Sequence, residues 1–377
     1  MSIFNDAIKN FLRPIEELLN DDSISEIMIN GPREIFIERK GQVTRTKNVF
    51  RDEEDLLSAI RSIAQSVGRT IDQQNPRLDA FLADGSRLCA VIPPLSKKGT
   101  TVAIRKFSQS KLGLNDLINF GALSKEAARF LDICVYLGKN ILVSGGTGSG
   151  KTTILNILGA RIPKGCRIIT IEDSQELQIV QEHIVSFITR KEDTGQNIKA
   201  VSMRDLVHSA MRLRPDRIVI GEVRGDEALD LVQIMNTGHD GSMGTIHSNN
   251  PKDACTRLEL LCLLGDTKIP PDLVRKMVGS ALQIVVQAHR FSDGKRKITE
   301  ISEVLGVDHY GNYIVKDIFK WVQKGKDEQG NLIGEMIPCG YLPSFFDLIV
   351  VNRLPFPREN FLMPEWAQVQ LKVKKAA

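Results

Sequence analysis

One nine-residue segment constrains the fold of this chain more than any other. It reads Gly145-Gly146-Thr147-Gly148-Ser149-Gly150-Lys151-Thr152-Thr153, which fits the pattern G-x-x-x-x-G-K-[ST]. The segment lies between an apolar run at 141–143 and an apolar helical pattern at 152–158. Its glycines let backbone N–H groups face one point, and the dipole of the following helix favours an anion there. The segment therefore predicts a phosphate-binding loop, in which Lys151 reaches the β- and γ-phosphates and the Thr152 hydroxyl binds Mg²⁺.

Two other apolar runs lead into a carboxylate. The run 168–171 is followed by Glu172, and the run 218–220 is followed by one glycine and Glu222. Ligands of open α/β sheets bind at the carboxyl ends of the strands, so we expect both acids at the edge that carries the loop. A Mg²⁺-dependent hydrolase needs one carboxylate that holds the metal through water and another that orients the attacking water. The two acids suit these roles, and the alternative of solvated acids at strand ends is disfavoured because both share a sheet with the loop.

Two histidines follow within one short segment. His247 comes directly after the apolar run 243–246, so we expect it at the sheet edge that faces the γ-phosphate. A neutral imidazole there can hydrogen-bond and sense the phosphate. His239 follows Gly238, and we expect it on the loop above the site in the same role. The alternative is that one or both histidines are structural, and no third metal ligand lies near them in the sequence.

From residue 117 onward, helical patterns alternate with short, wholly apolar runs. Apolar runs of this kind are typical of a sheet that is buried on both faces, with helices as crossovers between parallel strands. We therefore expect residues 117–290 to form an α/β nucleotide-binding domain. Within it, the pattern at 271–286 is helical. Residues 291–377 are predicted to form a C-terminal extension that is rich in β-structure around 297–321.

The first third of the chain follows a different pattern. Short strand-like runs surround one helical pattern at 52–67, in which apolar residues recur at helical spacing. Asp84-Gly85 separates two of these runs and is typical of a β-hairpin. Residues 1–107 are therefore predicted to form a smaller α+β N-terminal domain, and the polar stretch 108–116 is predicted to be a linker.

The composition narrows the class of protein. Lys and Arg number 50 against 46 Asp and Glu, and a net charge of only +4 disfavours a generically basic nucleic-acid binder. No run approaches the ~18–20 apolar residues that span a bilayer. An acid stands among the first residues, where a signal peptide has basic ones, and the six cysteines form no C-x-x-C pair. We therefore expect a cytoplasmic protein without a nucleic-acid partner.

Four motifs in order resemble those of the secretion ATPase superfamily, which serves type II secretion, type IV pili and type IV secretion. They are Walker A at 145–153, an Asp-box-like Thr170-Ile-Glu172-Asp173, a Walker B segment at 213–224 and a His box at 237–247. Three segments, 212–217, 235–243 and 84–88, are similar to signatures of the CpaF/TadA branch, whose members assemble tight-adherence pili. The resemblance covers residues 20–350.

The resemblance implies a P-loop RecA-like ATPase domain, with a parallel sheet flanked by helices, joined to a smaller N-terminal domain in a hexameric ring. It implies ATP and Mg²⁺ between the two domains. Glu172 is then the catalytic glutamate, and Glu222 is the Walker B carboxylate that holds Mg²⁺ through water. Arg87 and Arg105 match arginines that the family sends from the N-terminal domain to the phosphates, a role that suits the guanidinium fork.

We therefore expect a hexameric cytoplasmic ATPase that powers tight-adherence pilus assembly or secretion. It is expected to dock on an inner-membrane platform protein and so to associate peripherally with the inner membrane. The nearest alternative is the traffic ATPase of a type IV secretion or conjugation system, which shares all four motifs. A RecA-like nucleic-acid translocase is disfavoured by the near-neutral charge, and a nucleotide-gated scaffold is disfavoured by the intact Lys151, Glu172 and Glu222.

Overall fold

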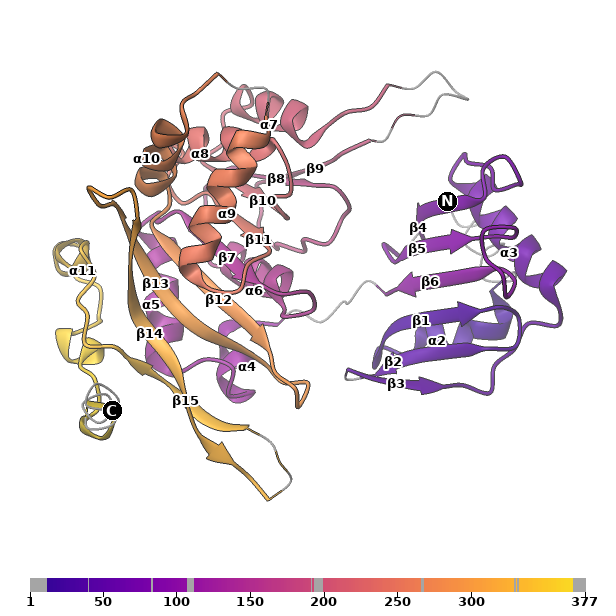
Figure 1. Cartoon of the computed structure of the whole chain (residues 1–377), viewed down its shortest axis with the longest axis horizontal. Helices are drawn as coiled ribbons and strands as arrows, with labels where there is room; N and C mark the ends of the chain where they lie inside the picture. The colour runs from indigo at the N-terminus through magenta and orange to yellow at the C-terminus, as the bar shows by residue number, and fades with distance from the viewer. Residues whose placement is uncertain are drawn as a thin grey trace. The chain divides into compact units, whose positions relative to one another are not determined.

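The chain divides into two compact units, Met1–Lys111 and Leu112–Ala377 (Figure 1). The structure is a computed structural model, and it describes residues 12–39, 41–82, 84–106, 112–190, 192, 199–265, 268–328, 330 and 332–368. Residues 108–111 of the predicted linker lie outside the described residues, and its last residues, 114–116, belong instead to the helix α4 (Leu114–Asn119), which Gly113 caps. A linker at 108–111 stays a prediction.

The smaller unit is built on a six-stranded antiparallel sheet with the order β3-β2-β1-β6-β5-β4. Helix α3 buries its apolar side in the core of this unit, and Asp52 caps it by accepting a hydrogen bond from Asp55 N. This confirms the predicted helix. The elements are η1 (Arg13–Ile15), α2 (Glu16–Asn20), β1 (Ile24–Asn30), β2 (Ile35–Arg39), β3 (Gln42–Arg45), α3 (Glu53–Ser66), β4 (Arg77–Phe81), β5 (Arg87–Val91) and β6 (Thr101–Arg105).

The larger unit contains a nine-stranded sheet with the order β15-β14-β13-β12-β7-β11-β10-β8-β9. The strands from β12 to β9 in this order are parallel, and β13, β14 and β15 continue the sheet in antiparallel pairing. The strands are β7 (Ile141–Gly145), β8 (Ile168–Glu172), β9 (Ile184–Ile188), β10 (Arg217–Ile220), β11 (Met243–Ile246), β12 (Ile284–Arg290), β13 (Arg296–Val307), β14 (Tyr313–Lys326) and β15 (Leu332–Pro338).

Helices cover both faces of this sheet, as its apolar strands predict. One face packs against α7 to α10, and the other packs against α4 to α6 and the segment around α11 (Figure 1). The helices are α4 (Leu114–Asn119), α5 (Lys125–Tyr136), α6 (Lys151–Gly159), α7 (Met203–Met211), α8 (Glu227–Asn236), α9 (Pro251–Leu264), α10 (Pro271–Ala281), α11 (Phe346–Val351) and η2 (Arg358–Phe361). The prediction of an α/β P-loop domain and a separate, smaller α+β unit is confirmed.

One predicted element is wrong. The helical pattern at 271–286 ends as helix α10 at Ala281, and Ile284 begins strand β12, which pairs in parallel with β7. Its first residues, Ile284 to Val286, are β-branched, apolar and fully buried, and such residues pack well in a sheet that is covered on both faces. The strands predicted for the C-terminal extension thus belong to the same sheet as the P-loop strand.

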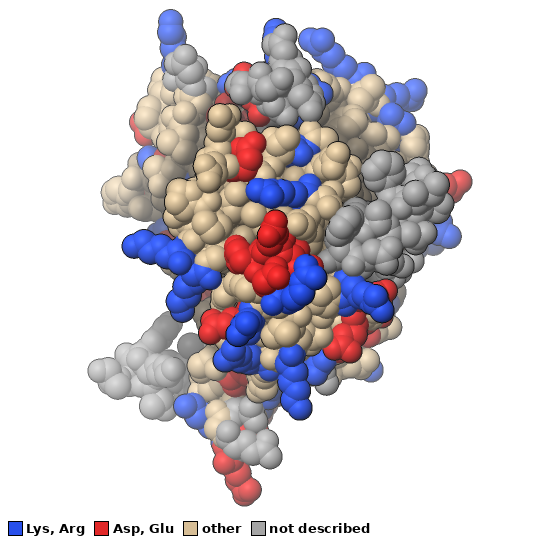
Figure 2. Space-filling view, turned by 90° about the vertical axis from the view of Figure 1, so that its right-hand side faces the viewer, with Lys and Arg blue, Asp and Glu red and all other residues tan. Residues whose placement is uncertain are grey.

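Two further observations concern membrane-crossing helices and the charge of the surface. Among the described residues, no helix combines the length and the apolar character that crossing a bilayer requires. Figure 2 shows a face on which Lys and Arg side chains surround a central group of Asp and Glu side chains, so charges of both signs are interspersed there.

Candidate active site

The phosphate-binding loop lies where the sequence predicts it. Strand β7 is buried along its whole length between β11 and β12, and the loop that follows it leads into α6 at Lys151. Gly148 and Gly150 have φ values of +70° and +95°, a region that glycine enters without steric cost. Lys151 is buried, and its Nζ donates a hydrogen bond to Gly146 O at 3.1 Å. The lysine is therefore folded back over the loop that it is expected to serve.

His247 lies close to both Lys151 of the loop and the carboxylate of Glu222. Its Nδ1 lies 3.4 Å from Lys151 Nζ, and its Nε2 lies 2.8 Å from Glu222 Oε1. Burial lowers the pKa of His247, and the nearby charge of Lys151 lowers it further, so the ring is neutral at physiological pH. Nε2 also lies 3.5 Å from Lys151 Nζ, so the neutral ring is close to both the ammonium group of the loop and the Glu222 carboxylate.

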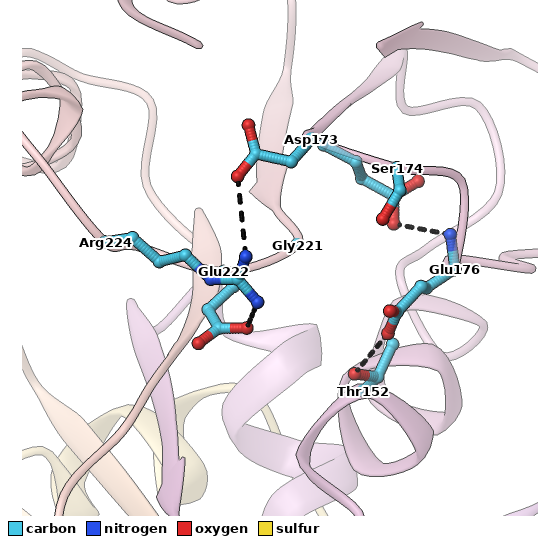
Figure 3. Close-up of a pocket in the computed structure, with 8 residues that line it drawn as sticks. Thr152, Asp173, Ser174, Glu176, Gly221, Glu222 and Arg224 are labelled. Carbon is cyan, nitrogen blue, oxygen red and sulfur yellow. Dashed lines mark hydrogen bonds and ion pairs between the residues drawn. The ribbon is translucent and has the colours of Figure 1, made fainter. Parts of the chain in front are cut away.

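Arg224 holds the other side of Glu222. Its Nη2 lies 2.5 Å from Glu222 Oε2, and its Nη1 lies 3.8 Å from Asp173 Oδ2, so one guanidinium bridges two carboxylates (Figure 3). Burial raises the pKa of Glu222, but the Arg224 hydrogen bond and the charges of Arg224, His247 and Lys151 outweigh it and leave the pKa below its ordinary value. Glu222 is thus held as an ionised, ion-paired carboxylate.

Glu172 lies in a different environment at the end of β8. Its side chain is almost fully buried, and its Oε1 accepts backbone hydrogen bonds from Glu176 N at 2.9 Å and Leu177 N at 2.8 Å. Burial raises the pKa of Glu172 to about 7, and the charge of Glu176 acts in the same direction against the two backbone hydrogen bonds. Near neutral pH, Glu172 can therefore take up and release a proton.

Glu172, Glu222 and Arg224 line one pocket beside the loop (Figure 3). Its lining residues are Thr152, Glu172, Asp173, Ser174, Glu176, Gly221, Glu222 and Arg224. Thr152 Oγ1 donates to Glu176 Oε2 at 3.3 Å, so a hydroxyl at the start of α6 points at a carboxylate inside the pocket. Hydroxyl and carboxylate oxygens are the ligands that Mg²⁺ prefers, and the lining residues therefore fit the predicted metal.

The structure does not bring His239 to this pocket. His239 precedes β11, whereas His247 follows it, so the two histidines lie at opposite ends of that strand. Near His239, Gly241 N and Ser242 N donate to the buried side chain of Asn140, just before β7 begins. The loop that carries His239 therefore lies at the end of the sheet away from this chain's own phosphate loop, and the expectation that it lies above the site is wrong for this chain.

Arg87 and Arg105 lie in the smaller unit. They are direct cross-strand partners on β5 and β6, and both side chains are exposed. Arg87 Nη2 lies 3.7 Å from Asp79 Oδ1. Facing residues of antiparallel strands project to the same side, so the two guanidinium groups share one face of the sheet. Their predicted role at the phosphates stays a prediction.

The sequence interpretation missed two charged residues of the pocket, besides Ser174 and Gly221. Arg224 stands two positions after Glu222, and Glu176 stands four after Glu172. Arg224 was visible as part of the Walker B segment, where a cation beside a carboxylate is a usable signal for an ion pair. Glu176 carries no such signal, because its place depends on the loop after β8.

Comparison with known proteins identifies the family. The type II/IV secretion system protein family matches residues 9–303. VirB11 of Bartonella henselae, a type IV secretion system protein, is 33% identical over 326 residues, which cover 77% of this chain and 91% of VirB11. A putative conjugal transfer protein of Mycobacterium tuberculosis is 33% identical over 294 residues, 76% of this chain and 83% of that protein.

An uncharacterized protein of Methanocaldococcus jannaschii is 47% identical over 237 residues, 61% of this chain, and the match spans only 33% of its length. Two solved structures share the fold. The pilus retraction motor PilT with bound ADP has a TM-score of 0.53 at 20% identity, covering 92% of this chain and 86% of PilT. The ATPase DotB of Legionella pneumophila has a TM-score of 0.52 at 18% identity, covering 78% and 80%. The chain belongs to the type II/IV secretion system protein family.

Proposed function

We propose that this chain is a Mg²⁺-dependent ATP hydrolase that works as a motor of a secretion or pilus machine. The observation that carries the proposal is the pair of carboxylates beside the phosphate loop, one with a pKa near 7 and one held ionised by cations. ATP hydrolysis needs a group that orients and deprotonates water and a group that supports the metal. The loop with Lys151 supplies the third requirement, a cradle for the phosphates.

The roles of the two carboxylates follow from their surroundings. Glu172 is the base, because burial keeps its pKa close to the pH at which it would work. Glu222, together with Thr152, would hold Mg²⁺, which when bound offsets charge on the phosphates. His247 contacts both Lys151 and Glu222, so it is suited to respond when a γ-phosphate displaces either contact. Arg224 keeps Glu222 ionised.

Arg87 and Arg105 would complete the site from the smaller unit. Two exposed guanidinium groups on facing positions of β5 and β6 form a fork that can accept an anion. Each substitution by Ala should slow hydrolysis by ~10²–10³-fold, as loss of a charge-stabilising donor does. Arg77→Ala is the control, because Arg77 lies on the neighbouring strand at the opposite end of the sheet. If Arg87→Ala and Arg105→Ala hydrolyse ATP at the same rate as Arg77→Ala and the wild type, the two arginines of the smaller unit have no part in the chemistry.

The assembled form is proposed to be a homohexamer that docks on a platform protein of the inner membrane from the cytoplasmic side. The family is one of secretion ATPases that form oligomers. The proposed contribution of Arg87 and Arg105 from the smaller unit to the site also favours assembly. Light scattering with Mg²⁺ and ATP present measures the mass. A monomer at micromolar protein under these conditions would rule the hexamer out.

The machine that the motor serves has two candidates. The CpaF/TadA-like segments favour a tight-adherence pilus. The VirB11 and conjugal transfer relatives, at 33% identity over more than three quarters of this chain, favour a type IV secretion or conjugation system. Neighbouring genes for prepilins and a pilus platform would support the first, and neighbouring genes for conjugation proteins would support the second.

Purified full-length protein tests the activity directly. Wild-type protein is expected to release phosphate from Mg·ATP, and Lys151→Ala is expected to abolish ATP binding because it removes the side-chain cation of the loop. Lys139→Ala serves as the control, since Lys139 is a buried lysine that packs over the ring of Phe345. Phosphate release by Lys151→Ala at the wild-type rate would show that the measured activity does not come from this site.

A further inference from the structure

The hairpin formed by β12 and β13 lies against the phosphate loop. Arg290, the last residue of β12, pairs with Arg296, the first residue of β13. The turn between them is braced: Phe291 N donates to Lys295 O at 2.9 Å, and Lys295 N donates to Asp293 Oδ1 at 3.0 Å. Both arginines are exposed and are presented by an ordered turn.

Three glycines of the loop face this hairpin closely. A methyl group added at Gly145 would lie 2.4 Å from Ala288 O, inside contact distance with the backbone of β12. At Gly148 it would lie 3.3 Å from Arg290 Nη1, and at Gly150 it would lie 3.6 Å from Arg296 Cδ. At Gly145 the backbone of β12 therefore excludes a side chain, whereas at Gly148 and Gly150 the positive φ favours glycine and the arginine side chains lie within contact range.

A hydrogen bond ties the two segments together. Arg296 Nε donates to Gly148 O at 2.8 Å. Because the peptide unit is planar, a carbonyl of Gly148 that points outward at Arg296 turns the N–H of Ser149 toward the inside of the loop. Ser149 N donates there to Gly146 O at 3.3 Å, a long hydrogen bond that a phosphate oxygen can replace.

We propose that Arg296 is a positioning residue of the nucleotide site: it fixes the loop with its N–H groups inward, and Arg290 packs beside Gly148 to support the same conformation. The proposal rests on the proposed nucleotide binding. A loop that is ordered before the ligand arrives loses less conformational entropy on binding, so the effect falls on affinity. Neither arginine is expected to touch the reacting atoms.

Three substitutions at one position test the mechanism. Arg296→Ala removes the donor, and about a tenfold weaker affinity is expected for a fluorescent ADP analogue and for Mg·ATP, the size of one hydrogen bond from a charged donor. KM for ATP should rise by a similar factor while kcat stays within about twofold. Arg296→Gln places an amide nitrogen at the same distance along the side chain without the charge, so it should recover most of the affinity. Arg296→Lys keeps the charge but has no donor at that atom, so it should recover less.

The control is Lys295→Ala, which removes a positive charge from the same turn and should leave affinity unchanged. If Arg296→Lys binds as wild type while Arg296→Gln binds as Arg296→Ala, then general attraction by charge acts instead, and the positioning role is overturned. Wild-type affinity in Arg296→Ala would overturn it as well.

Hydrogen exchange of the loop amides separates this proposal from the proposed function. Arg296→Ala should speed exchange at Ser149 and Gly150 in the full-length protein without nucleotide, and Lys295→Ala should not. If the wild-type protein binds no nucleotide, the proposed function fails, and the exchange rates still decide whether Arg296 orders the loop. Unchanged exchange in Arg296→Ala contradicts the positioning role whatever the affinity shows.

Discussion

Glu172 ends β8, and Glu222 follows the neighbouring strand β10 after one residue, yet their surroundings differ in kind. The register of β8 and β10 puts Ile171 beside Ile220, so the two acids leave the sheet close to one another. Glu172 is buried and meets backbone N–H groups, and its pKa rises to about 7. Glu222 meets Arg224 and His247, and its pKa falls. The comparison teaches that the environment of an acid, more than its place at a strand end, assigns its role.

The largest expected effect separates the two acids by turnover. Glu172→Gln should keep ATP binding but lower kcat by ~10²-fold or more, the scale of a positioned base. Phosphate release under single-turnover conditions measures it, with binding of a fluorescent ATP analogue as the control. Hydrolysis by Glu172→Gln at the wild-type rate would remove Glu172 as the base and make Glu222 the first candidate.

The second effect concerns stability. The pKa of Glu172 is higher in the folded protein than its ordinary value of 4.5, so the folded protein holds a proton that the unfolded chain has released between pH 4.5 and about 7. Stability is therefore lost as the pH rises through this window, by about 3 kcal/mol in all. The Gln side chain of the Glu172→Gln variant does not titrate. Relative to the wild type, the free energy of unfolding of this variant should therefore rise by up to this amount at pH 8 and by little near pH 5. Urea unfolding at both pH values checks the difference, and an equal difference at both would contradict the raised pKa.

A third, smaller effect should appear in the pH dependence of activity. If ionised Glu172 is the base, kcat/KM should rise about tenfold from pH 6 to its plateau above pH 8, because this parameter follows the free enzyme. If Glu222 were the base, kcat/KM would be flat over the same range, since the pKa of Glu222 is lowered from 4.5. The residual activity of Glu172→Gln should lack the rise.

The smallest effect tests whether the two environments are independent. Arg224→Ala removes the hydrogen bond to Glu222, and because the Arg224 side chain is 57% exposed we expect a loss of kcat/KM of at most about fivefold. The midpoint of the pH profile should stay near 7, as it belongs to Glu172. A midpoint that moves by a full pH unit in this variant would show that the two carboxylates titrate as a coupled pair.

Much of this site could be predicted from the sequence. The loop, Glu172, Glu222 and His247 each follow an apolar strand, and the carboxyl ends of parallel strands meet at one edge. The same rule places His239 at the other edge, because it precedes a strand, so the prediction for His239 went against the topology. Local pattern and strand direction together were sufficient for these residues.

Other features depend on contacts between distant segments. Ile284 to Val286 follow helix α10 after only two residues, so their apolar character extended the helical pattern and hid strand β12. The pKa of Glu172 depends on the loop that returns Glu176 N and Leu177 N to it. No local pattern reports either arrangement, since both are decided by tertiary packing.

The close packing of the loop glycines against β12 bears on how the motif evolves. A relative that ceased to use nucleotide would still need glycine at position 145, because any side chain there would collide with the backbone at Ala288. Substitutions would then accumulate at Lys151 and Thr152 sooner than at Gly145. In such a lineage the glycine would be retained because of packing alone. Only Lys151 and the hydroxyl of Thr152 would then indicate that a relative still uses nucleotide.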